Sequence, residues 1–180
     1  MSVIEGPKLA ELIERGVIDA LPENVNGASI DVRIGNQVLM EIAPDSLGFI
    51  ADLGAKESIT FDAVTVPDEG LIIYPGQCFL AHTVESLNLP DDISCEFKLR
   101  SSVARCFLDH CLAGWADPGF HGTLTLEFVN MTQHHMLRIR PGQRIGQLVF
   151  FQHGDSCEYS YRHRGRYGGQ TTAQAGKGIE

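Results

Sequence analysis

Long apolar runs and an excess of positive charge are both missing from this sequence of 180 residues. The longest hydrophobic runs are far shorter than the roughly 20 residues that cross a bilayer, and the first residues do not resemble a signal peptide. The formal net charge is −9, whereas surfaces that coat nucleic acid or anionic membranes are basic. We therefore expect a cytoplasmic protein that binds neither nucleic acid nor membranes. Local basic clusters still allow a small anionic ligand.

Closely spaced cysteine pairs are missing as well. The cysteines are odd in number and scattered along the chain, at positions 78, 95, 106, 111 and 157. Disulfide frameworks and zinc knuckles need cysteines at short, regular spacings. The sequence therefore predicts reduced thiols.

The composition is that of an ordinary globular domain, with 43% hydrophobic and 21% charged residues. A chain of this length supports one domain with a real core. Leu9, Leu12 and Ile13 recur at helical spacing, with Pro7 suited to the first turn and Gly16 to the stop. The pattern predicts one short helix near the N-terminus.

After this helix, short β-type segments alternate with turn residues. The predicted strands are residues 29–34, 37–42, 58–61, 70–75, 78–87, 94–99, 123–130, 137–142 and 145–152. Such regular punctuation is typical of an all-β sandwich or barrel. From residue 161 the sequence turns Gly-rich and basic, without an apolar period. We expect a β domain over residues 1–160 and a C-terminal tail over 161–180.

Residues 98–105, "KLRSSVAR", place basic side chains and hydroxyls in one short stretch. Guanidinium groups, hydroxyls and free backbone N–H groups in a turn suit phosphate oxygens. On this motif alone, a solvated basic turn is about as good an interpretation. The "AGWADPGF" turn at residues 113–120 and the basic tail favour the phosphate site.

The strand at residues 123–130 alternates strictly between two kinds of side chain. One face carries Leu124, Leu126 and Phe128, and the other carries Thr123, Thr125, Glu127 and Val129. Because successive strand residues point to opposite faces, the leucine face predicts core. The face with Glu127 suits either solvent or the wall of a wet pocket.

Several motifs together resemble the dCTP deaminase branch of the dUTPase-like superfamily. They are "RSSVAR" at residues 100–105, "AGWADPGFHGTLTLEFVN" at 113–130, "RPGQRIGQLVF" at 140–150 and "RYGGQ" at 166–170. Residues 24–36 and 74–90 extend the similarity over most of the chain. The resemblance implies a distorted β-barrel or jelly-roll with a short N-terminal helix and a flexible tail. It also implies a homotrimer with active sites between subunits, closed by the tail.

The resemblance assigns the catalytic work to four residues of this chain. Glu127 would be the acid and base of deamination. Arg105 and Ser101 would help to place the base and the attacking water, and Ala113 would offer its backbone to the cytosine ring. The loop at residues 106–112 is one residue shorter than the common family version.

The resemblance also implies the substrate-binding residues. The triphosphate would be held by the 100–105 motif and clamped by the tail, and Asp117 would meet the deoxyribose 3′-hydroxyl. The predicted binding residues are Arg100, Ser101, Ser102, Arg105, Asp117, Tyr161, Arg166 and Gln170.

The function implied first is deamination of dCTP to dUTP and ammonia, without zinc, in the supply of dUMP and dTTP. Zinc deaminases of bases carry H-x-E followed by P-C-x-x-C. None of the seven histidines is followed two residues later by Glu, and no C-x-x-C occurs. We expect no metal ligand from the protein itself, with Mg²⁺ arriving on the triphosphate.

Other readings stay open. The chain could be a bifunctional dCTP deaminase and dUTPase that forms dUMP and pyrophosphate, or a dUTPase alone, because Asp117 stands where dUTPases activate water. Glu127 favours deamination over dUTPase activity alone. A regulatory β-barrel without catalysis is disfavoured by the intact candidate residues. Inhibition by dTTP is a further possibility that the sequence does not decide.

Overall fold

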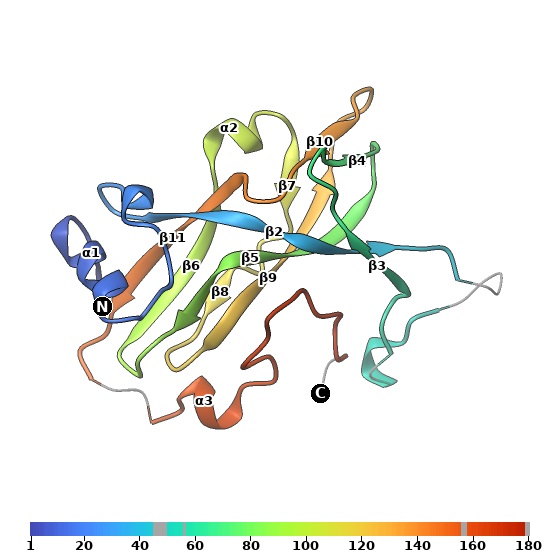
Figure 1. The fold of residues 1–180 in the computed structure, drawn as a ribbon. Coiled ribbons are helices and arrows are strands. Elements are labelled where there is room, and N and C mark those ends of the chain that lie inside the picture. The colour runs from blue at the N-terminus through green and yellow to red at the C-terminus, as the bar shows by residue number, and fades with distance from the viewer. Residues whose placement is uncertain (45–49, 56, 156–157, 179–180) are drawn as a thin grey trace.

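The computed structural model describes residues 1–44, 50–55, 57–155 and 158–178, and its framework is a curled β-sheet (Figure 1). The helical elements are α1 (Pro7–Glu14), η1 (Pro22–Asn24), η2 (Leu53–Ala55), α2 (Ser101–Ala104) and α3 (Tyr161–Arg164). The strands are β1 (Ser2–Val3), β2 (Ile30–Glu41), β3 (Phe61–Thr65), β4 (Leu71–Ile73), β5 (Cys78–Asn88), β6 (Ile93–Leu99), β7 (Leu108–His110), β8 (Trp115–Ala116), β9 (His121–Asn130), β10 (Leu137–Ile139) and β11 (Arg144–Gln152).

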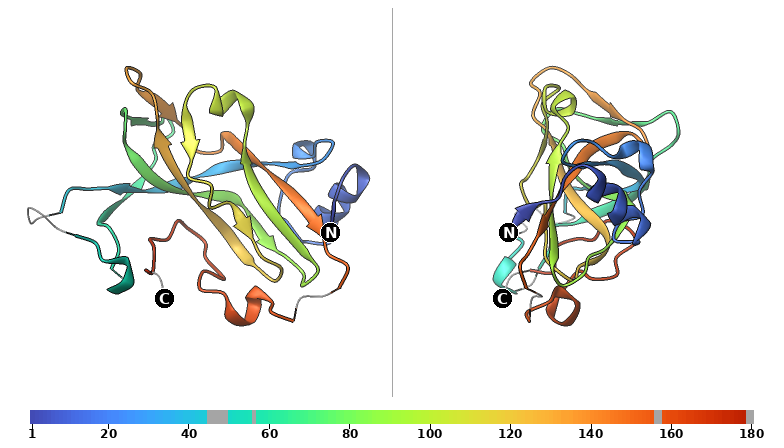
Figure 2. Two further views of the ribbon diagram at one scale, coloured as in Figure 1. Left: turned by 180° about the vertical axis from the view of Figure 1, so that it is seen from behind. Right: turned by 90° about the vertical axis from the view of Figure 1, so that its left-hand side faces the viewer.

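The main sheet has the order β7-β9-β5-β2-β11-β6-β8, with β1 added to β11 and β3 added to β2. The paired strands run antiparallel, and β10 and β4 form a separate two-stranded sheet. The sheet curls around its core like an incomplete barrel (Figures 1 and 2). The prediction of a mainly β, barrel-like fold is confirmed.

The sheet encloses one apolar core. Its largest fully buried side chains include Phe79, Phe128, Phe150, Leu126 and Ile34. Helix α1 closes one end of the core with Leu9 and Leu12, and Gly16 follows it with a φ of 68°. The predicted N-terminal helix is thus confirmed, because its apolar spacing matches the face that it buries.

Several strand predictions were wrong in their bounds. Residues 29–34 and 37–42 belong to the single strand β2. The strand continues through Gly35 and Asn36, because its pairing with β5 shifts register between Ile34 and Val38 instead of ending there. Gly35 allows the close approach there: a Cβ atom at this position would lie 2.2 Å from the ring of His82. The segment 58–61 is strand only at Phe61, because pairing with β2 selects Phe61–Thr65 instead.

Strands β1, β7 and β8 and helices α2 and α3 were not predicted, because each spans only two to four residues. A period cannot be read from so few residues. Helix α2 occupies the 100–105 motif, and α3 opens the C-terminal tail. These two helices lie at opposite ends of the sheet in all views (Figures 1 and 2). The division at residue 160 stays a prediction.

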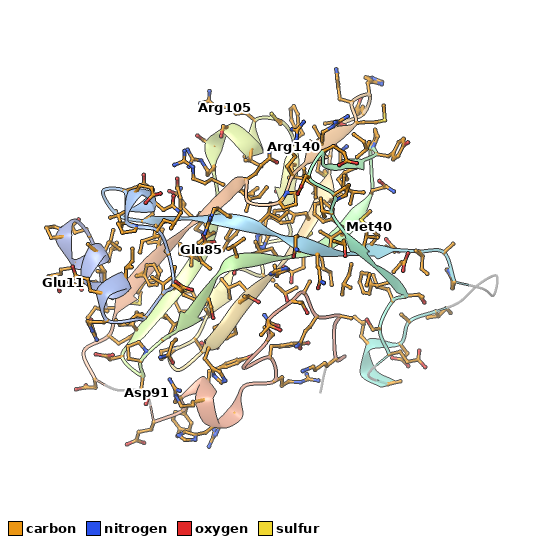
Figure 3. The ribbon with its side chains drawn as sticks, viewed as in Figure 1. Glu11, Met40, Glu85, Asp91, Arg105 and Arg140 are labelled. Carbon is orange, nitrogen blue, oxygen red and sulfur yellow. The ribbon has the colours of Figure 1, made fainter. Side chains whose placement is uncertain are left out.

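A buried ion pair ties β2 to β5. Glu85 is 1% exposed, and its two carboxylate oxygens accept from the backbone N–H and the Nε–H of Arg33, each at 2.7 Å. Figure 3 shows Glu85 inside the sheet. Each oxygen therefore has a partner, as a buried carboxylate requires. In the described part of the chain, no helix is long and apolar enough to span a membrane.

Candidate active site

A cavity of about 460 Å³ lies between the outer face of β9, the C-terminal tail and the segment before β3. Figure 1 shows the tail running below the sheet from α3 to a point near η2. The cavity is lined by Leu53, Glu57, Ser58, Ile59, Phe61, Leu80, Ala113, Trp115, Asp117, Phe120, Leu124, Thr125, Glu127, Tyr161, Tyr167, Gln170, Gln174, Gly176 and Gly178. Apolar walls with a few polar groups are typical of small-molecule sites.

Glu127 stands in the middle of β9, between β5 and β7. It pairs with Leu80 of β5, and its carbonyl oxygen accepts from the N–H of Cys111 at 3.1 Å. Leu126 and Phe128 on either side of it are buried in the core. The side chain of Glu127 is 32% exposed and reaches the cavity. The alternation read from the sequence is therefore confirmed, and Glu127 lies on a cavity wall.

The Glu127 carboxylate lies close to a histidine side chain. Its Oε2 lies 3.5 Å from Nε2 of His110 at the end of β7. The negative field around it also acts on Cys111: burial raises the pKa of this thiol, and the charges of Glu127 and then Asp109 raise it further. Cys111 therefore stays a neutral thiol at neutral pH.

Asp117 enters the cavity from a tight turn that follows β8. The carbonyl of Asp117 accepts from the N–H of Phe120 at 3.1 Å, which closes the turn. Its Oδ1 accepts from the indole Nε1–H of Trp115 at 2.9 Å. The indole ring packs against Phe151, with ring centroids 5.7 Å apart. Trp115 is therefore a fixed donor that orients the Asp117 carboxylate.

The tail docks on the first half of β9 through Gln170. The backbone N–H of Thr123 donates to the carbonyl oxygen of Gln170 at 2.9 Å. The backbone N–H of Gly169 donates to the carbonyl oxygen of His121 at 2.8 Å. The Gln170 amide donates to the carbonyl of Thr123 at 2.5 Å and accepts from Thr125 Oγ1 at 3.3 Å. Gln170 is 4% exposed. Its amide here holds the tail to the strand.

Two further contacts fix the start of the tail. Ser160 Oγ donates to Asp91 at 2.5 Å, and the ring of Tyr161 packs on Phe120 with centroids 5.4 Å apart. The N–H of Tyr167 donates to the Tyr161 hydroxyl at 3.0 Å. The tail is thus an ordered wall of the cavity.

Arg166 is engaged within the tail rather than in the cavity. Its guanidinium donates to the carbonyls of Lys177 and Gly178 at 2.8 and 3.0 Å, and the Lys177 ammonium donates back to the Arg166 carbonyl at 2.6 Å. The Lys177 ammonium also lies 4.7 Å from the centre of the Tyr167 ring. These contacts close the tail into a loop.

A second cavity of about 480 Å³ lies beside α2. Arg100 and Ser102 line it together with Arg138 and Arg144. Asp31, which is buried, forms ion pairs with Arg100 and, at 3.4 Å, with Arg144. An acidic group thereby holds two guanidinium groups beside this cavity.

The predicted site residues fall into three groups in this chain. The first cavity brings together Ala113, Asp117, Glu127, Tyr161 and Gln170. The second cavity contains Arg100 and Ser102. Neither cavity is lined by Ser101, Arg105 or Arg166. Arg105 is exposed at the end of α2, far from the tail (Figure 3). The catalytic and binding roles of all these residues stay predictions.

Sequence reasoning missed three features of the site. The contact of His110 with Glu127 joins two strands whose pairing could not be read from a three-residue strand. The hydrogen bond from Trp115 to Asp117 was also missed. The two residues are two positions apart in an extended segment, and this spacing places their side chains on the same side of the chain. Several residues from η2 to Phe61 line the cavity opposite the tail, and nothing in their composition predicts this position.

Metal-ligating side chains are scattered over residues 1–44, 50–55, 57–155 and 158–178. These ranges contain no group of three or more His, Cys, Asp or Glu side chains placed to hold a metal ion. Cys78, Cys95, Cys106 and Cys111 are free thiols, and the prediction for Cys157 lies outside the described residues. Burial strongly raises the pKa of Cys95, so this thiol is unreactive in the folded state.

Fold and site together define a mainly β protein with a carboxylate-lined cavity covered by its own C-terminal tail. Residues 3–153 match the family model described as dCTP deaminase-like. The chain belongs to this dCTP deaminase-like family.

Two relatives carry the name "dCTP deaminase, dUMP-forming". The one from Persephonella marina is 39% identical, over 95% of both chains. The one from Methanospirillum hungatei is 33% identical, over 96% of this chain and 94% of the relative. The similarity therefore includes the tail as well as the sheet.

A solved structure supports the fold. The crystal structure of 2′-deoxycytidine 5′-triphosphate deaminase from Agrobacterium tumefaciens matches with a TM-score of 0.64 and 22% identity. The match covers 82% of this chain and 47% of that chain, so this chain spans about half of the solved one.

We predict that Gly122→Ala releases the tail from β9. Gly122 has a φ of 110°, and a Cβ atom there would lie 2.6 Å from the carbonyl oxygen of Gln170. A clash costing about 1.4 kcal/mol opens a docked segment about tenfold more often. Trypsin cleavage after Arg164 and Arg166 should therefore accelerate by about tenfold or more.

The matched control is Gly76→Ala. Gly76 also has a positive φ, 78°, but a Cβ atom there meets nothing within 4 Å. The Gly76→Ala variant should lose stability through backbone strain, but cleavage of its tail should not be faster than in the wild-type protein. Equal cleavage rates in the two variants would contradict the role assigned to Gly122.

Proposed function

We propose that this protein is a bifunctional enzyme that converts dCTP to dUMP, ammonia and pyrophosphate. The expectation from sequence put deamination to dUTP first, but relatives of matching length are named dUMP-forming, which favours the bifunctional alternative. One observation carries the proposal: Glu127 and Asp117 line the same cavity. Two carboxylates in different settings can serve two different hydrolytic steps.

The first step is deamination at C4 of cytosine. Glu127 takes a proton from the attacking water and gives it to the ring nitrogen, then takes the proton of the new C4 hydroxyl and gives it to the amine, so that the C–N bond breaks, ammonia leaves and the C4 carbonyl forms. Its position between Leu80 and Cys111 holds the carboxylate on a wall that is partly closed to solvent. Ala113 is exposed and lines the same cavity, where its backbone would offer hydrogen-bonding groups to the ring.

The second step is hydrolysis of the dUTP formed. Asp117 accepts a proton from a second water, which attacks the α-phosphate while pyrophosphate leaves. The Trp115 indole donates to Oδ1 of Asp117 and leaves Oδ2 for the water or for the 3′-hydroxyl.

The complete site is inferred to lie between copies of this chain in a homotrimer. Arg100 and Ser102 line a cavity separate from the one that contains Glu127. Ser101 and Arg105 are exposed on α2, at the other end of the sheet from α3 (Figure 1). A triphosphate held by the basic motif of one subunit could then place its base in the tail-covered cavity of a neighbour.

Mg²⁺ is inferred to enter with the triphosphate and to offset its charge. The carboxylates needed for chemistry then remain free, and the guanidinium groups near α2 add positive charge at the phosphates. Zinc-independent deamination and a cytoplasmic location are part of the same proposal.

The proposal is tested by a time course with dCTP and Mg²⁺ in which dUTP, dUMP and pyrophosphate are resolved. We expect dUMP and pyrophosphate in equal amounts as end products. Stable accumulation of dUTP would instead identify a deaminase alone. Turnover of dUTP without turnover of dCTP would identify a dUTPase.

Glu127→Gln should abolish deamination while the fold and nucleotide binding persist. The amide cannot take a proton from water, and loss of a general base costs about 10²- to 10⁴-fold in rate. The free energy of unfolding should change by no more than about 1 kcal/mol, because the side chain lies outside the core. The measurements are dCTP turnover, calorimetric binding of dCTP with Mg²⁺ and thermal unfolding.

The control for this variant is Glu57→Gln. Glu57 lines the same cavity but is exposed in the segment before β3. It should retain most of the activity. A Glu127→Gln enzyme that deaminates dCTP at the wild-type rate would remove Glu127 from the mechanism.

Asp117→Asn should separate the two steps. With saturating dCTP, we expect formation of dUMP to fall about 100-fold or more, while part of the deamination survives and dUTP accumulates. Asp62→Asn, at an exposed position of β3, is the control and should leave both products unchanged. Parallel loss of both activities at saturation would show that Asp117 only binds the sugar.

A further inference from the structure

His110 is a buried histidine held in an aromatic setting. It ends β7 and is 4% exposed. Its ring lies against Phe97, with centroids 4.8 Å apart, and against Phe128, with centroids 5.7 Å apart. These rings come from β6 and β9, so three strands fix the imidazole plane. Such a ring has little freedom to turn away from its neighbours.

One ring nitrogen faces the candidate general base. Nε2 of His110 lies 3.5 Å from Oε2 of Glu127. Within the part of the chain that the structure describes, both atoms are buried and neither has a hydrogen-bond partner. Buried polar atoms in native proteins are nearly always paired. The two atoms are each other's available partner, and a small closing movement would bring them within bonding distance.

We propose that His110 is a positioning residue that holds the Glu127 carboxylate for catalysis in both of its protonation states. This inference rests on the proposed deaminase function of the same site. His110 does not line the cavity, whereas Glu127 does, so His110 acts through the carboxylate rather than on the substrate.

The chemistry of imidazole suits this task. When Glu127 is ionised, the Nε2–H tautomer of neutral His110 donates to Oε2. When Glu127 carries the proton taken from water on Oε1, the same Nε2–H donates to Oε2, which is then the carbonyl oxygen of the acid. Glu127 passes its protons to the ring nitrogen and the amine of the substrate. His110 gains and loses no net proton over the cycle.

The other groups around His110 are uncharged or bonded elsewhere, so Glu127 is the charged group that its ring faces. Asp109 precedes His110 and uses Oδ1 to accept from the His110 backbone N–H at 2.9 Å. Cys111 follows and stays a neutral thiol, because its pKa is raised by burial and by the charge of Glu127. The packed faces of β6 and β9 offer the rings of Phe97 and Phe128, which carry no charge.

The kinetic test compares His110→Phe with His110→Gln. Phenylalanine keeps a ring between Phe97 and Phe128 but has no donor, whereas glutamine can place an amide nitrogen near the position of Nε2. We expect His110→Phe to lower kcat for deamination by about 10- to 100-fold, the loss of one hydrogen bond to a charged group, with a KM within about threefold of wild type. His110→Gln should recover most of kcat. Unchanged kcat in His110→Phe, or equal defects in both variants, would overturn the proposal.

A second measurement does not depend on activity. The side-chain ¹⁵N resonances of His110 are compared at neutral pH in the wild-type protein, in Glu127→Gln and in Glu57→Gln as the control. Removing the carboxylate should shift the Nε2 signal, because the Nε2–H then loses its charged acceptor. An unchanged Nε2 signal in Glu127→Gln would also overturn the proposal.

The two measurements separate this inference from the proposed function. If wild-type protein does not deaminate dCTP, the proposed function fails, and the resonance experiment alone decides whether His110 engages Glu127. If wild-type protein is active and His110→Phe is equally active, the function stands and the inference fails.

Discussion

The register of β9 is the constraint on which the rest of the site depends. β9 is paired on both sides, with Phe79 and Leu80 of β5 opposite Phe128 and Glu127. Strand side chains alternate, so a slip of one residue would turn Phe128 to the cavity and Glu127 to the core. The cost of burying that carboxylate and exposing that ring keeps the register fixed. Core packing thereby sets the position of the candidate catalytic group.

The same strand also carries the tail. The first half of β9 pairs with Gln170 of the tail, and its second half carries Glu127, which lines the cavity. The same strand therefore positions both the carboxylate and the tail. The docking is polar: backbone and amide hydrogen bonds, with little apolar burial beyond Tyr161 and Ala173. Such contacts are individually weak and easily exchanged with water. These docking contacts can therefore break without disturbing the core.

The basic motif at residues 100–105 is positioned by an ion pair rather than by strand register. Arg100 is held by Asp31, a buried carboxylate of β2, which also lies near Arg144. Fixing a guanidinium group in advance lowers the entropy lost when a phosphate binds. Because this motif and Glu127 line separate cavities of one chain, the proposed chemistry depends on a neighbouring copy to bring them together.

The sequence by itself determined the mainly β class, the N-terminal helix and the two faces of residues 123–130, because periodicity and turn residues act locally. Its ordered motifs also identified the family. The tertiary structure alone decided which candidates meet. It placed Gln170 against β9, engaged Arg166 within the tail and set His110 beside Glu127. The contacts of Gln170 and His110 join different elements of the fold and depend on strand order and register, whereas those of Arg166 depend on the path of the folded tail. No local pattern encodes either.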